Sequence, residues 1–123
     1  MFNQVPLKKN REPQNQKIMS FNGTEGDPIS LTDAATMTEE FRTQNEGATK
    51  GHFFGKEILN DILAQKKCVG IRFYNGIDAS GAYTLIAAGA DTFENDQIGV
   101  SDTIAEYSKP CPPSCGTAND LNS

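Results

Sequence analysis

A change of pattern at Cys68 limits the folds open to this chain more than any other feature of its sequence. Within residues 68–74, the apolar residues Val69, Ile71 and Phe73 alternate with the other four, which is the two-residue period of a β-strand. Turn-forming residues follow at 75–76 and at 78–81, and residues 82–90 have the composition of a returning strand. The sequence therefore predicts an antiparallel β-hairpin over residues 68–90.

Two segments before the hairpin have the apolar spacing of helices. We expect the first over residues 32–45, capped by Ser30 or Thr32 and closed by Gly47, with a narrow apolar stripe made of Leu31, Ala34, Ala35, Thr38 and Phe41. The second is expected over residues 56–66, where one apolar face consists of Ile58, Leu59, Ile62 and Leu63. A further short strand is expected around residues 98–100 or 103–107.

Because the helices precede the strands without βαβ alternation, the pattern predicts an α+β domain, over residues 29–107. We expect two helices packed on a small antiparallel sheet centred on the hairpin. Residues 1–28 are rich in Asn, Gln, Lys and Pro and are predicted to form a flexible leader. Residues 108–123 form a C-terminal tail that contains prolines and cysteines. Met19 directly precedes the patterned part of the chain, so we hypothesise that it, rather than Met1, is the natural start.

Composition narrows the classes of function. The net charge is −5, and beyond residue 28 the chain has seven basic against thirteen acidic residues, which argues against nucleic-acid binding. No apolar stretch approaches the roughly 18 residues of a membrane span, and residues 1–10 lack the apolar run of a secretory signal. The sequence therefore predicts a cytoplasmic protein that binds neither nucleic acid nor membranes.

The tail contains the motif Cys111-Pro112-Pro113-Ser114-Cys115-Gly116, and its thiols have three possible states. A zinc site would use His52, Cys68, Cys111 and Cys115, although the three-residue spacing of the last two is uncommon for zinc. A disulfide would join Cys111 to Cys115, or either of them to Cys68. The favoured expectation is that all three thiols stay free and pack against neighbouring residues. A catalytic pair of Cys68 with His52 is a weaker option. His52 is the only histidine of the chain, so no sequence pattern singles it out as the partner of Cys68.

Other polar groups point to structure rather than catalysis. Arg72 lies inside a predicted strand, where a charged residue usually forms an ion pair within the molecule. The acidic loop 91–96 lacks the order of a calcium loop, and the glycines at 47–55 do not match a phosphate-binding loop. The segment His52-Phe53-Phe54 is interpreted as a hydrophobic anchor for the second helix, with Gly51 and Gly55 as hinges.

Four segments resemble a family of small uncharacterised proteins common in Bacteroidota bacteria. They are Ile29–Ala35, Gly51–Gly55, Gln65–Tyr74 and the Cys-Pro-Pro-Ser-Cys-Gly tail with Leu121-Asn122. The resemblance covers about three quarters of the chain, and it implies no activity and no catalytic residue.

We therefore expect a non-enzymatic interaction or structural module, such as a subunit of an assembly, that binds a protein partner or itself. The alternative is a small zinc-binding or thiol–disulfide module using His52 and the three cysteines. Zinc is the one cofactor that the pattern allows.

Overall fold

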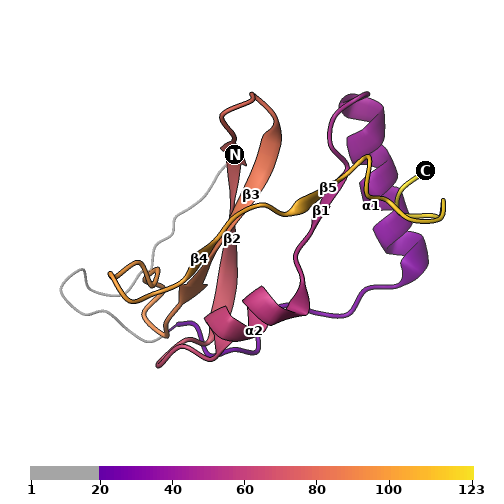
Figure 1. Ribbon diagram of the computed structural model, residues 1–123. Helices are drawn as coiled ribbons and strands as arrows, with labels where there is room; N and C mark the ends of the chain where they lie inside the picture. Colours follow the sequence, from indigo (N-terminus) through magenta and orange to yellow (C-terminus); the bar gives the residue numbers. More distant parts are fainter. Residues whose placement is uncertain (1–19) are drawn as a thin grey trace, which may run out of the picture.

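The computed structural model describes residues 20–123, and its two helices and two small antiparallel sheets confirm the α+β class (Figure 1). One sheet has the strand order β2-β3-β4 and the other pairs β1 with β5. In chain order the elements are α1 (Leu31–Gln44), β1 (Gly51–Phe53), α2 (Lys56–Leu63), β2 (Gly70–Ile77), β3 (Tyr83–Ala90), β4 (Ile104–Ala105) and β5 (Lys109–Cys111).

The predicted hairpin is confirmed as β2 and β3, which pair in register from Gly70 opposite Ala90 to Ile77 opposite Tyr83. The reversal lies at residues 78–82, where the Asp78 carboxylate accepts hydrogen bonds from the backbone amides of Ser80 (2.9 Å) and Ala82 (3.0 Å). Residues 75–76, which the sequence marks as a turn, instead continue β2, because pairing with β3 outweighs their local turn preference.

The third strand of this sheet is β4, at the second of the two predicted locations. It pairs Ala105 with Ala87, on the edge of β3 opposite β2. The same edge of β3 bonds to the loop before β4, since Asp96 bridges Ala90 and the Gln97 amide donates to the Gly89 carbonyl (2.8 Å). β3 is therefore the central strand and β2 is an outer strand.

The core lies between α2 and one face of the hairpin sheet. Ile62, Ala87 and Ala105 form its buried centre, and half-buried Ile58, Ile71, Cys68 and Phe54 pack against them. α2 ends three residues earlier than predicted. Lys67 has a φ of 69°, which turns the chain from the end of the helix into β2 within a few residues.

α1 begins as predicted, with the Ser30 hydroxyl accepting a hydrogen bond from the Asp33 amide (3.0 Å). Gly47 follows its end with a φ of 85°. Among the residues that the structure describes, α1 contributes none to the buried core, and Leu31 and Phe41 of the predicted stripe are exposed. α2 is thus the helix that packs on the hairpin sheet, whereas α1 lies beside the C-terminal tail (Figure 1).

The described part of the predicted leader, residues 20–28, contains no helix or strand. It is attached to the loop after β3, because the Ser20 and Phe21 amides both donate to the Thr92 carbonyl at 2.9 and 3.2 Å. The alternative starts at Met1 and Met19 lie outside the described residues. Within residues 20–123, neither helix has the length and apolar character needed to span a bilayer.

Candidate functional site

The C-terminal tail docks on the segment that precedes α2. β5 pairs with β1, with Gly51 opposite Cys111 and Phe53 opposite Lys109, and the Lys50 amide donates to the Cys111 carbonyl (2.6 Å). The sequence interprets the β1 segment as an anchor for α2 and does not predict this pairing. Two three-residue strands this far apart along the chain have no periodic signal, and Pro110 in β5 cannot donate to a ladder.

A disulfide joins Cys111 to Cys115, so the favoured expectation of free tail thiols is wrong for these two residues. Their Cα atoms are 4.7 Å apart, and the loop between them is held by a hydrogen bond from the Ser114 amide to the Pro110 carbonyl (2.9 Å). Cys111 is buried, with 9% of its surface exposed, whereas Cys115 is half-buried. Cys111 is therefore the more buried of the two bridged residues.

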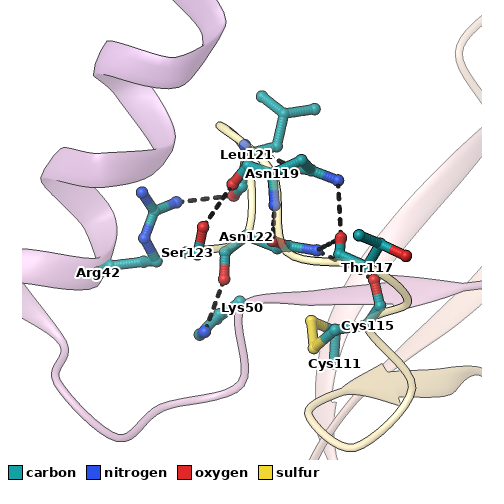
Figure 2. Close-up of a disulfide and its surroundings, with 9 residues drawn as sticks. All are labelled: Arg42, Lys50, Cys111, Cys115, Thr117, Asn119, Leu121, Asn122 and Ser123. Carbon is teal, nitrogen blue, oxygen red and sulfur yellow. Dashed lines mark hydrogen bonds between the residues drawn. A yellow bond between two sulfur atoms is a disulfide. The ribbon is translucent and has the colours of Figure 1, made fainter.

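Beyond the bridge, the last residues form a compact turn organised by Asn119 and Asn122 (Figure 2). The Asn122 side chain donates to the Cys115 carbonyl (3.0 Å) and accepts from the Asn119 amide (2.8 Å). The Asn119 side chain accepts from the Leu121 amide (2.8 Å). Asparagine side chains that bond to nearby backbone in this way stabilise local turns.

Two basic side chains hold this turn against the rest of the molecule. Arg42 of α1 donates to the Leu121 carbonyl and Lys50 donates to the Asn122 carbonyl, both at 2.7 Å. Figure 2 shows both side chains reaching the tail from one side, with the bridge at its start. The tail is therefore attached to the rest of the molecule at β1 and at these two cations, and the disulfide closes a loop within it. No sequence motif signals Arg42 or Lys50.

The structure gives the four predicted zinc ligands separate partners, although His52 and Cys111 belong to the paired strands β1 and β5. Cys111 and Cys115 are bonded to each other, and the half-buried His52 side chain contacts Ser108, with Nδ1 and Oγ 3.2 Å apart. Cys68 is a free thiol that packs against the core and donates to the Gly70 carbonyl (3.2 Å). Among the described residues, no three His, Cys, Asp or Glu side chains are placed to hold a metal ion. No bridge joins Cys68 to the tail either.

The predicted ion pair of Arg72 is confirmed, and its partner is Asp96. The Tyr74 hydroxyl donates to the same carboxylate, and the Phe21 ring lies over the Arg72 guanidinium, 5.4 Å from its centre. The hydrogen bond from Tyr74 and the hydrogen bond and charge of Arg72 lower the pKa of Asp96, and the hydrogen bonds to Asp96 raise the pKa of Tyr74 and of Arg72. The cluster fastens the loop after β3 to the face of the sheet opposite α2.

Two glutamines join the loop before β4 to the end of α2. The Gln65 side chain donates to that of Gln97 (2.9 Å) and accepts from the Thr103 amide (2.5 Å), and Gln97 donates to the Lys66 carbonyl (2.8 Å). The bond between the two glutamines lies close to Gly89, where an added Cβ would be 2.5 Å from the Gln97 side-chain oxygen and 3.0 Å from the Gln65 side-chain nitrogen. A glycine at this position therefore leaves room for the glutamine network.

The outer edge of β2 is the longest unpaired backbone edge that residues 20–123 present. β2 has eight residues and pairs on one side only, with β3. Phe73, Tyr74 and Ile77 are 47%, 45% and 68% exposed. Arg72 is the single charged residue of the strand, and Asp96 already pairs with it.

Comparisons with known proteins were made with the whole chain. No protein-family model, no curated protein and no solved structure matches it. The resemblance to the Bacteroidota family thus stays a prediction from the sequence, and the function has to be argued from the geometry above.

Proposed function

We propose that the protein is a non-enzymatic structural module, an assembly subunit that associates with a second copy of itself through the outer edge of β2. The observation that carries the proposal is the composition of this edge: eight strand residues without a proline or an acidic residue, with large apolar side chains exposed. Natural proteins usually shield such edges with charges, prolines or bulges, because open edges pair with other strands. A partner strand is the simplest account of this composition.

Electrostatics favours this edge for contact between two copies. The net charge of −5 makes copies of the chain repel one another on average. Along β2, however, the charge of Arg72 is compensated within the same chain by Asp96. Two copies that meet along β2 therefore place no uncompensated like charges opposite each other.

The residues of β2 also suit pairing with themselves. If two β2 strands run antiparallel about a two-fold axis at Tyr74, Ile71 of each copy lies opposite Ile77 of the other, and Phe73 lies opposite Asn75. The two-fold axis creates two equivalent Ile71–Ile77 pairs, and both lie on the same face of a continuous six-stranded sheet.

Size-exclusion chromatography with light scattering, over a series of protein concentrations, tests the proposal. Ile77→Lys places a charge on the edge at a side chain that is 68% exposed, and Val100→Lys, at a fully exposed residue of the loop before β4, is the matched control. We expect a dimer for the natural chain and for Val100→Lys, and a monomer for Ile77→Lys with an unchanged circular dichroism spectrum. A natural chain that stays monomeric at every concentration contradicts the proposal, as does a dimer that Ile77→Lys leaves intact.

The Cys111–Cys115 bridge favours a second candidate, the thiol–disulfide module. Its zinc-binding form would require the bridge to be reduced and His52 and Cys68 to approach both thiols. Native mass spectrometry with and without reductant and chelator separates the cases. An added zinc mass in the reduced protein supports the metal site, whereas reduction with no metal uptake at equimolar zinc argues against it.

A further inference from the structure

The docked C-terminal tail contains a disulfide, which thiols can reduce. We infer that the Cys111–Cys115 bridge is a site of thiol–disulfide exchange with a dithiol reductant, and that its reduction releases residues 112–123 from the Arg42 and Lys50 side chains. This inference is independent of pairing along β2. It rests on where the bridge lies: it joins the last residue of β5 to Cys115, just before the turn that Arg42 and Lys50 hold.

β5 is held by its pairing with β1, whereas the path of the residues that follow β5 depends on the bridge. Pro110, Pro112 and Pro113 have no amide hydrogen, so three of the residues around the bridge cannot donate a backbone hydrogen bond. The bonds from Arg42 and Lys50 are at exposed positions, where water competes for the same carbonyl oxygens. The disulfide is the one covalent restraint that brings residues 116–123 back over these two side chains.

The two bridged residues differ in burial, and we assign the order of the exchange from this difference. An incoming thiolate attacks Sγ of the half-buried Cys115 and forms a mixed disulfide, and Cys111 leaves as a thiolate. The second thiol of the reductant then attacks its own sulfur in the mixed disulfide and frees Cys115. The protein gains two electrons and two protons, and the dithiol leaves as a disulfide.

The redox state of the surroundings then decides the position of the tail. In an oxidising compartment the bridge is closed and the tail is docked, whereas a reducing cytoplasm, the location that the sequence predicts, keeps both thiols reduced. Cys68 lies in the core next to the hairpin and takes no part in this change.

Amide hydrogen exchange of the full chain, with and without dithiothreitol, tests the inference. The chain-entropy relation for a five-residue loop predicts that reduction raises the open population of the tail about 30-fold. We expect exchange to accelerate by about this factor at Ser114, whose amide bonds to the Pro110 carbonyl within the bridged loop. Exchange in β2 and β3 should not change.

Two variants complete the design. A Cys111→Ser/Cys115→Ser double variant should show the fast exchange without reductant, and Cys68→Ser should respond to dithiothreitol as the natural chain does. The inference is overturned if the bridge resists millimolar dithiothreitol in the folded protein. It is also overturned if the mass rises by two hydrogens while tail exchange stays slow, or if β2 and β3 lose protection to the same extent as the tail.

Discussion

Replacing Ile62 with alanine should destabilise the fold by about 3 kcal/mol, because Ile62 is the one large side chain among the described residues that is fully buried. The change removes three carbon atoms, which contribute about 2.4 kcal/mol at about 0.8 kcal/mol per buried group. The remaining cavity adds a smaller amount, since the neighbouring Ile58 and Ile71 are only half-buried and can move into it.

Urea unfolding followed by far-ultraviolet circular dichroism measures this change, and Leu63→Ala is the matched control on the same helix. Leu63 is 47% exposed, so its truncation should lower the free energy of unfolding by about 1 kcal/mol. Equal losses for the two variants would refute the argument that α2 holds the hairpin through Ile62.

Three further outcomes follow from the described contacts. Gly89→Ala should lower the free energy of unfolding by about 1–3 kcal/mol, because its Cβ would displace the Gln97 side chain. Gly70→Ala is the control and should cause no such loss, since a Cβ added there meets no atom within 4 Å. Thermal unfolding compares the two variants. Folding lowers the pKa of Asp96, so the native state holds the carboxylate more readily than the unfolded state does. This stabilisation is fully present above the ordinary aspartate pKa of 3.8 and is lost as the pH falls through the lowered native pKa. Urea unfolding midpoints measured between pH 2 and 6 should therefore fall more steeply with acid for the natural chain than for Asp96→Asn. Asn122→Ala removes three hydrogen bonds of the terminal turn and should speed amide exchange at Asn119 about tenfold, whereas Thr117→Ala, whose side chain makes no such bond in the described structure, should not.

Local patterns predicted the parts of the fold in which neighbouring residues determine the structure. The alternation at residues 69–73 and the turn residues at 78–81 specify the hairpin, and Ser30 specifies the start of α1. The ion pair of Arg72 was predicted as a kind of contact, since a charge inside a strand needs a partner. Its partner could not be predicted, because any of several acidic residues in the loop 91–96 satisfies the same requirement.

The contacts of the tail could not be predicted for a different reason. β1 and β5 are three-residue strands separated by more than fifty residues. The sequence of neither strand contains information on the entropy cost of closing so long a loop. The state of the thiols depends on the same long-range geometry. Cys111 and Cys115 bond to each other within the tail, and Cys68 stays a free thiol.

Hydrogen exchange along β2 at low and high protein concentration tests the proposed self-association most directly. The amides on the outer edge of β2 have no partner in a single copy within the described residues, and β3 protects the inner ones. Pairing between two copies predicts that the outer amides exchange more slowly as the concentration rises, while the inner amides keep their rates. Outer amides that exchange equally fast at every concentration would contradict the proposal.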